Sequence, residues 1–218
     1  MNAAALEVLH ADEYLLVLDK PAGVLSVPGR GEDKQDCLSA RAQKIYPDAL
    51  VVHRLDMATS GLMLMARGAD MQRRLGKAFE ERQIQKRYVA VVDGMPDQRL
   101  ADGDGWSVID LPIIVDWPRR PLRIIEPLLG KPSVTRWRLL ATDRIAMTSR
   151  LALEPVTGRS HQLRVHLQAI GHAILGDPLY ANDEICARSV RLLLHAQTLE
   201  FNHPATGRPM RFESPEPF

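Results

Sequence analysis

The first third of the chain predicts two strands, a turn and a helix. Short apolar runs at residues 8–10 and 14–18 are rich in strand-forming residues, and the segment 20–23 with its Pro-Ala-Gly sequence ends the second run. A helix follows, which we expect Asp36 to cap and Pro47 to end. Its apolar face has helical spacing and consists of Leu38, Ala42, Ile45 and Tyr46.

The middle of the chain continues with a polar segment, a buried strand and an amphipathic helix. The polar residues 53–60 come directly before the apolar run 61–66, which predicts a strand. The helix after it has one apolar face, formed by Met71, Leu75, Ala78 and Phe79. A strand is predicted at 88–92. Residues 93–133 are rich in Gly, Pro and Asp, which is typical of long loops with short strands, and loops of this length tend to be functional.

The last third predicts two more strands, a helix and a hairpin. The strands are expected at 134–140 and 148–154, where alternation indicates one buried face. Ser160 is the expected cap of the helix and Gly171 its stop. Its core face comprises Leu163, Leu167 and Ile170, and the hairpin joins 195–201 to 209–212. The simplest architecture is α+β: one domain over 1–218 with a mixed, largely antiparallel sheet flanked by helices and long loops.

Composition places the chain among globular proteins. Of its 218 residues 45% are hydrophobic, enough for an ordinary core, and no apolar run approaches the roughly 20 residues that cross a bilayer. The N-terminus lacks the pattern of an export signal. Cys37 and Cys186 lie far apart without neighbouring ligands, so neither a disulfide framework nor a zinc site is indicated. We therefore expect a cytoplasmic protein that is not bound to a membrane.

Charge becomes informative only when it is divided along the chain. The net charge is +1, but residues 54–90 carry eight Lys/Arg against four Asp/Glu, and residues 116–144 carry seven against three, so each segment sums to +4. Such an uneven distribution is what a basic groove for nucleic-acid phosphates would produce. Solvated helix faces can be equally basic, so the pattern alone leaves both interpretations open.

Two polar clusters carry candidate chemistry. The first, residues 53–61, places Asp56 in a loop directly before a buried strand, although an Arg-x-Asp pair is also typical of a surface salt bridge. The second, residues 157–166, opens a helix on which His161, Arg164 and Gln168 form one polar stripe. That stripe fits either an exposed helix surface or a site. His161 and His166 lie on different faces, which disfavours a metal site.

These motifs together resemble the RluA family of pseudouridine synthases. The resemblance covers almost the whole chain in the family's order: His53-Arg54-Leu55-Asp56 with Thr59-Ser60-Gly61, then Lys86-Arg87-Tyr88-Val89-Ala90, then Gly158-Arg159-Ser160-His161-Gln162-Leu163-Arg164-Val165-His166, then Leu194-His195-Ala196. It implies a single pseudouridine-synthase-type domain and three catalytic residues. Asp56 matches the essential aspartate, Tyr88 the tyrosine beneath the target base, and Arg164 the basic partner of the aspartate.

The resemblance also implies what the protein binds. The expected partner is structured RNA, namely the anticodon stem-loop of tRNA and a hairpin of 23S rRNA, bound by a monomer without cofactor or metal. Arg54 matches an arginine that enters the RNA stack where the uridine leaves it. The other expected RNA contacts come from the same motifs and from the run 116–121: His53, Arg119, Arg120, Arg159 and His161. The motifs begin too near Met1 for an S4-like RNA-binding domain, so none is expected.

Two other functions and one mechanistic choice stay open at this point. An RNA stem-loop-binding protein without catalysis would use Asp56 only structurally, and activity separates it from an enzyme. A metal-dependent nuclease would require several converging carboxylates, whereas the motifs contain only one. For an enzyme, Asp56 must stay ionised in a dry pocket, and Arg164 favours that form. The sequence leaves open whether Asp56 attacks C1′ or abstracts a proton.

Overall fold

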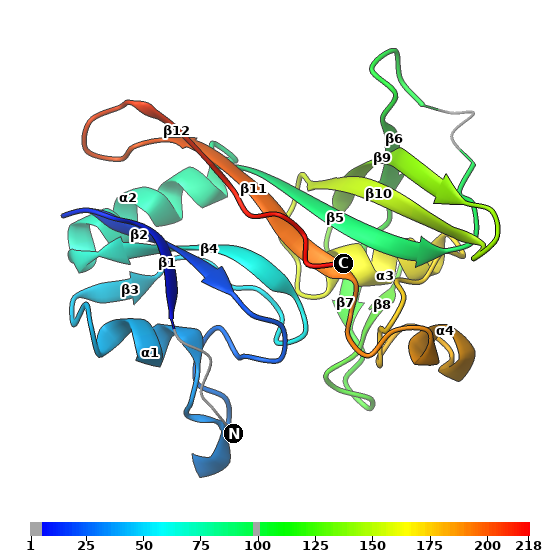
Figure 1. The fold of residues 1–218 in the computed structure, drawn as a ribbon, viewed down its shortest axis with the longest axis horizontal. Helices are drawn as coiled ribbons and strands as arrows, with labels where there is room; N and C mark the ends of the chain where they lie inside the picture. Colours follow the sequence, from blue (N-terminus) through cyan, green and yellow to red (C-terminus); the bar gives the residue numbers. More distant parts are fainter. Residues whose placement is uncertain (1–5, 98–100) are drawn as a thin grey trace. The chain divides into compact units, whose positions relative to one another are not determined.

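The computed structural model describes residues 6–97 and 101–218 (Figure 1). The chain divides into two compact units. The aspartate unit consists of residues 1–86 and 195–217, and the arginine unit consists of residues 87–194 with Phe218. Each unit has its own strands and helices, and the fold class is α+β, as predicted. The assignment of all 218 residues to one catalytic domain stays a prediction.

The aspartate unit is built on a mixed sheet in which β4 is central. The strand order is β1-β2-β4-β11, with β3 paired to β4 and β12 paired to β11. The strands are β1 (Glu7–Ala11), β2 (Leu15–Lys20), β3 (Ala49–Val51), β4 (Ser60–Arg67), β11 (Leu194–Asn202) and β12 (Pro209–Glu213). All of these pairs are antiparallel except β4 with β11, which run parallel with His195 opposite Ser60. The predicted mixed, largely antiparallel arrangement is confirmed here.

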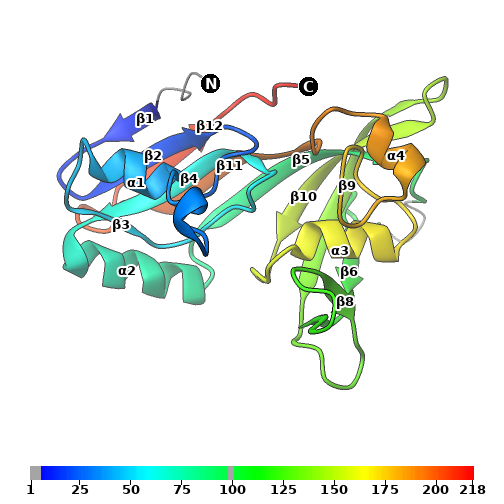
Figure 2. The same cartoon turned by 90° about the horizontal axis from the view of Figure 1, so that it is seen from below.

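Both faces of β4 are buried because a helix covers each. On one face Leu62 and Leu64 pack in a cluster with Met71 and Leu75 of α2 (Gly68–Glu80). Alternate residues point the other way, where Met63 packs in a second cluster that includes α1 (Leu38–Gln43). Both helices can be followed in Figure 2. The two-residue period of the strand thus divides one apolar run between two cores.

The arginine unit has an antiparallel sheet of strand order β5-β10-β9-β6, and a separate hairpin β7–β8. The elements are β5 (Gln85–Asp93), β6 (Ser107–Asp110), β7 (Ile113–Val115), β8 (Arg123–Ile125), β9 (Val134–Asp143), β10 (Thr148–Pro155), α3 (Gln162–Ala169) and α4 (Asp183–Ala187). Helix α3 packs against β8, β9 and β10. The strands predicted from alternation are confirmed, whereas α4 and β3 were not predicted.

The predicted helix caps are wrong in two places. Cys37, not Asp36, caps α1: its Sγ accepts from the Ala40 amide at 3.4 Å. The Asp36 carboxylate is instead paired with Arg41 at 2.6 Å, and it therefore does not cap the helix. Because α1 ends at Gln43, Ile45 lies beyond it and is 60% exposed rather than part of the core face.

Helix α3 begins one residue later than expected. His161, not Ser160, precedes its first turn, with a left-handed φ of 60° and no side-chain cap hydrogen bond. Both cysteines are free thiols. Among the described residues, no helix combines the length and apolar character that a membrane span requires.

Candidate active site

Asp56 lies in the segment between β3 and β4, which we call the aspartate loop (residues 53–60). The residue is half-buried, while its neighbours Arg54 and Met57 are exposed. Its carbonyl accepts a hydrogen bond from the Thr59 amide at 3.1 Å, which closes a turn directly after the carboxylate. The loop therefore delivers Asp56 immediately before the rigid, buried strand β4.

A buried ammonium group holds the middle of the aspartate loop. Lys20, the last residue of β2, is 0% exposed. Its Nζ donates to the carbonyls of Pro21 at 3.0 Å, Val24 at 2.8 Å and Met57 at 3.1 Å. The Gly23 amide donates to the same Met57 carbonyl at 2.8 Å. A buried cation is costly unless it is hydrogen-bonded, so these bonds fix the residue after Asp56 to the segment that follows β2.

The residue before Asp56 is held from two directions by one hydroxyl group. Ser26 Oγ donates to the Leu55 carbonyl at 2.8 Å and accepts from the Leu55 amide at 3.1 Å. Both residues are buried. Because Leu55 and Met57 are both anchored, the backbone on each side of Asp56 is fixed, which is the preorganisation that a catalytic carboxylate needs.

The end of the loop is anchored by a buried histidine. Ser60 Oγ lies 2.8 Å from His195 Nδ1, and His195 Nε2 lies 3.0 Å from the Ser214 carbonyl oxygen. A carbonyl can only accept, so Nε2 carries a proton, and in the neutral ring Nδ1 then accepts from the Ser60 hydroxyl. Gly61 follows with φ +108°, and a Cβ there would lie 2.3 Å from the Ala196 carbonyl oxygen. Glycine thus permits the close approach of β4 and β11.

His53, at the start of the aspartate loop, is part of the local packing. Its Nε2 accepts the Leu64 amide at 2.9 Å, and its ring centroid lies 4.6 Å from that of Phe79. Burial, helped by the nearby charge of Lys86, lowers the pKa of His53 to about 3. His53 is therefore neutral near pH 7, so a contribution to RNA binding, which stays a prediction, would not come from its charge.

In the arginine unit Arg164 is held in a fixed orientation by a buried carboxylate. Its Nε and Nη2 donate to the two Asp177 oxygens at 2.8 and 2.6 Å, and both side chains are at least 97% buried. Asp177 also accepts the amides of Leu179 at 2.9 Å and Tyr180 at 3.2 Å. Such a bidentate pair fixes the plane of the guanidinium and leaves its Nη1 edge unused by Asp177.

Tyr180 links Arg164 to His161. Its ring lies 5.1 Å from the Arg164 guanidinium carbon, and its hydroxyl accepts the Arg123 amide at 2.9 Å. Burial raises the pKa of the Tyr180 hydroxyl to about 12, so the group is protonated and can donate to His161 Nδ1 at 2.7 Å. His161, an expected RNA contact, thus belongs to the network that supports Arg164.

The other expected residues of the arginine unit are more exposed. Tyr88 lies on β5 opposite Leu153 of β10 and is half-buried. Arg159 is exposed, with its amide bonded to Gln162 Oε1 at 3.0 Å. The structure therefore groups His53, Arg54 and Asp56 in one unit, and Tyr88, Arg159, His161 and Arg164 in the other. The pairing of Asp56 with Arg164 stays a prediction.

Arg119 and Arg120 lie together in a turn between β7 and β8, called the tryptophan turn here (residues 116–122). The Arg119 Nε donates to the Asp116 carboxylate at 2.6 Å. The Arg120 guanidinium carbon stands 4.3 Å from the centroid of the Trp117 ring, which is 63% exposed. An exposed aromatic ring stacked on a guanidinium is a surface on which RNA bases and phosphates can bind.

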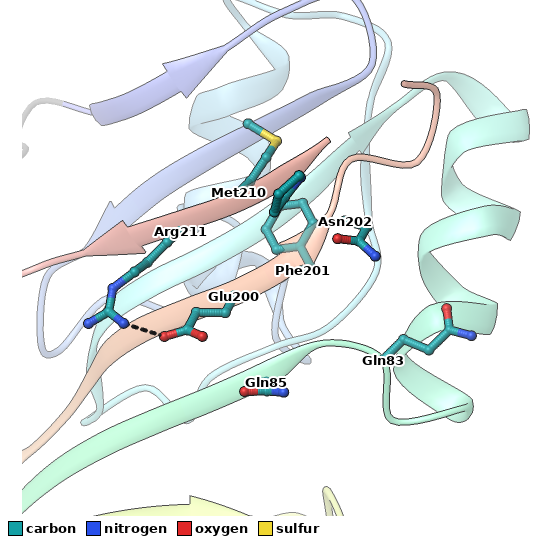
Figure 3. A pocket seen from close by; sticks show the side chains of 8 residues that line it. Gln83, Gln85, Glu200, Phe201, Asn202, Met210 and Arg211 are labelled. Carbon is teal, nitrogen blue, oxygen red and sulfur yellow. Dashed lines mark hydrogen bonds and ion pairs between the residues drawn. The ribbon is translucent and has the colours of Figure 1, made fainter. Parts of the chain in front are cut away.

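A separate hollow in the aspartate unit does not resemble an active site. It measures about 340 Å³ and is lined by side chains that include Gln83, Gln85 and Asn202 (Figure 3). Arg211 there is paired with Glu200 at 2.7 Å and also with Glu213, so carboxylates outnumber the cation and disfavour phosphate. Within the described ranges, no group of three or more His, Cys, Asp or Glu side chains could hold a metal ion.

Several positioning residues were missed by the sequence analysis. Lys20, Ser26 and His195 support the aspartate loop, and Asp177 and Tyr180 support Arg164. His195 stands in one of the motifs quoted above, which was the only available signal for it. Ser26, Asp177 and Tyr180 act through contacts between segments that are separated in sequence. Lys20 was missed because lysine is usually exposed and no local pattern indicates its burial.

The sequence matches the family of RNA pseudouridylate synthases over residues 14–169. Among curated proteins, the dual-specificity RNA pseudouridine synthase RluA of Escherichia coli (strain K12) is 46% identical over 215 residues, which cover 98% of this chain and 94% of the relative. The protein of the same name from Yersinia pestis is 46% identical over 206 residues, covering 94% of this chain and 97% of the relative.

Solved structures give the same result. Human RNA Pseudouridylate Synthase Domain Containing 1 superposes with a TM-score of 0.76 at 27% identity, covering 100% of this chain and 87% of that protein. Human RNA Pseudouridylate Synthase Domain Containing 4 also has a TM-score of 0.76, at 25% identity, with coverage of 97% and 88%.

Proposed function

The chain belongs to the RNA pseudouridylate synthase family and converts uridine in RNA to pseudouridine, and we propose that its substrates are stem-loops of tRNA and of 23S rRNA. The observation that carries the proposal is the 46% identity, along 98% of the chain, to a relative named as a dual-specificity RNA pseudouridine synthase. The family resemblance adds the anticodon stem-loop and a 23S hairpin with a similar loop. We also propose that pseudouridine formation takes place in the cytoplasm and that the monomer carries it out.

In this proposal Asp56 is the catalytic carboxylate. The reaction breaks the bond between N1 and C1′, turns the base and joins C5 to C1′, so a carboxylate beside the ribose either attacks C1′ or removes a proton from the sugar. Both roles need an ionised carboxylate in a fixed place. The hydrogen bonds from Ser26 to Leu55 and from Lys20 to Met57 supply the fixed place.

Arg164 is proposed to keep Asp56 ionised during the reaction. Exclusion of water by the bound RNA would favour the neutral acid, and an adjacent guanidinium, which stays charged, favours the carboxylate. The bidentate bond to Asp177 supports this assignment because it holds Arg164 in one orientation. Asp177 and Tyr180 are then positioning residues.

Tyr88 is proposed to stack beneath the extruded uridine. A uridine inside a helix cannot present C1′ and C5 to protein groups, so it must leave the stack and gain an aromatic surface in the site. Exposed Arg54 is proposed to fill the gap that it leaves. Arg119, Arg120 and Arg159, which are also exposed, are proposed to contact the backbone, since A-form RNA presents phosphates more readily than base edges.

Replacement of the carboxylate tests the assignment. Asp56→Asn should fold and bind a stem-loop but form no pseudouridine, because the amide keeps the shape and loses the charge. Asp104→Asn, at an exposed position in the arginine unit, is the matched control and should keep full activity. Pseudouridine mapping in the anticodon stem-loop and the 23S hairpin measures the result. An active Asp56→Asn protein would overturn the role of Asp56, and loss of wild-type activity in EDTA would overturn the metal-free mechanism.

A further inference from the structure

Lys86 lies on β5 directly before the point where the chain passes from the aspartate unit to the arginine unit, and it is a half-buried cation without an anionic partner among the described residues. In the part of the chain that the structure describes, its ammonium has no ion pair or hydrogen bond. It makes a cation–π contact with the Phe79 ring, whose centroid is 5.7 Å from Nζ. Two cations on α2 differ: Arg74 is paired with Asp70 at 2.9 Å, and Lys77 lies 3.6 Å from Glu81. The surroundings of Lys86 thus lack the usual compensation for a cation withdrawn from water.

The groups around Lys86 form a short column with one positive charge. Within this column the Phe79 ring contacts both other members, Lys86 and the neutral His53 ring, whose centroid lies 4.6 Å from that of Phe79. Burial also lowers the pKa of the Lys86 ammonium. A cation on the face of an aromatic ring is restrained in position, so it loses less conformational entropy when it binds an anion. The column therefore offers a restrained positive charge.

The column lies at the start of the aspartate loop, because His53 is the first residue of that loop and Arg54 is the second. Lys86 is also two residues before Tyr88 on β5, and side chains two apart project to the same side of a strand. An anion that pairs with Lys86 would therefore lie near groups proposed to act on the target uridine. In RNA the available anions are the backbone phosphates.

We propose that Lys86 binds the backbone phosphate adjacent to the extruded uridine. This inference rests on the proposed function. Extrusion swings the nucleotide out about its own backbone, so a fixed cation at the flanking phosphate would hold the strand in its displaced path. The ligand is a phosphodiester of RNA, and the contact is independent of base sequence.

The test uses Lys86→Met, which keeps the aliphatic stem on Phe79 and removes the charge. In an Asp56→Asn background, affinity for a short anticodon stem-loop should fall about tenfold, and the slope of log K against log salt should decrease by about one. Lys86→Arg should restore most of the affinity. Lys44→Met, at an exposed position in the aspartate unit outside both basic segments, is the matched control and should bind normally. A purely structural role predicts instead a lower melting temperature with unchanged affinity and salt slope.

Neutral linkages in the RNA identify the phosphate. Stem-loops with one methylphosphonate at each position around the target uridine should show a loss at a flanking linkage in the Lys86-containing protein. In Lys86→Met the same linkage should cause no further loss, because the interaction is already gone. Additive losses at every linkage, or binding by Lys86→Met equal to that of Lys44→Met, would overturn the proposal. If the wild-type protein forms no pseudouridine in these stem-loops, the proposed substrates are wrong and this inference falls with them.

Discussion

The aspartate loop and the tryptophan turn are both polar connections, yet they are held in opposite ways. The aspartate loop is held by hydrogen bonds to Lys20, Ser26 and His195, which lie on other segments. The tryptophan turn is closed by its own backbone, with the Asp116 amide bonded to the Leu122 carbonyl at 3.1 Å. A group that must meet one reacting atom needs external anchors, whereas groups that meet a flexible phosphate backbone can lie on a self-contained, exposed turn.

Removal of the buried ammonium should give the largest effect. Lys20→Met removes the buried ammonium that the carbonyls of Pro21, Val24 and Met57 share as donor, while the Met57 carbonyl keeps the Gly23 amide. We expect the free energy of unfolding to fall by about 3 kcal/mol, since hydrogen bonds to charged groups are strong and unsatisfied carbonyls are costly. Pseudouridine formation should fall further than stability alone requires, because the aspartate loop loses its anchor.

Urea unfolding and single-turnover assays on the folded fraction measure these two effects. Lys44→Met, an exposed lysine in the same unit, should change neither quantity by more than about 0.5 kcal/mol. If Lys20→Met is as stable and as active as Lys44→Met, then the aspartate loop does not depend on external anchors and the comparison fails.

Ser26→Ala should give the next largest effect. It removes both hydrogen bonds to Leu55, and a stability loss of about 1 to 2 kcal/mol is expected because the buried Leu55 amide and carbonyl lose their partner. Turnover should fall while RNA affinity stays nearly constant, since Ser26 holds the loop that carries Asp56, the proposed catalytic carboxylate, and is itself buried. A change in affinity with normal kcat would contradict this role.

The sequence predicted most of the fold because the cores follow simple periods. The run 61–66 became β4, and the spacing of Met71 and Leu75 became the buried face of α2. One error occurred where a residue had two possible partners. Asp36 could cap α1 or pair with Arg41, and only the ion pair formed, while Cys37 served as the cap. Such local competition is decided by geometry that no spacing rule contains.

The candidate site was predicted from motifs, and its support was not. Asp56 was found because its polar cluster precedes a buried strand, but lysine is normally exposed, so nothing marked Lys20 as the anchor of that loop. Asp177 follows Arg164 by thirteen residues, and its bidentate contact depends on the path of the chain after α3. The roles of Asp56, Tyr88 and Arg164 in the reaction stay predictions.

The half-buried His53 predicts a modest pH dependence of stability. Its pKa is about 3 in the folded protein and about 6.5 when unfolded, so the unfolded state binds the proton first as the pH falls. The contribution of His53 is fully present above about pH 6.5 and is lost progressively toward pH 3. Between about pH 7.5 and about pH 5.8, the wild type should lose about 1 kcal/mol more than His53→Gln, which does not titrate.

Urea unfolding at several pH values measures the difference between the two slopes. Asp12, whose pKa is lowered to about 2, titrates below this window and does not interfere. Equal slopes for the two proteins would mean that the pKa of His53 is the same in the folded and unfolded states, so that burial does not keep its ring neutral as the pH falls below about 6.5.

The smallest effect on stability is expected in the tryptophan turn. Arg120 is exposed and stacked on Trp117, so Arg120→Ala should change the free energy of unfolding by less than about 0.5 kcal/mol. RNA binding should weaken to a similar degree for stem-loops of different sequence, with a salt slope reduced by about one, because the proposed contact of Arg120 is to phosphate. Arg208→Ala, in the exposed turn between β11 and β12, serves as the control and should bind normally. Fluorescence titrations at several salt concentrations give both slopes. A large loss of stability in Arg120→Ala, or an unchanged salt slope, would show that the turn supports the fold rather than the RNA, and the contrast with the aspartate loop would disappear.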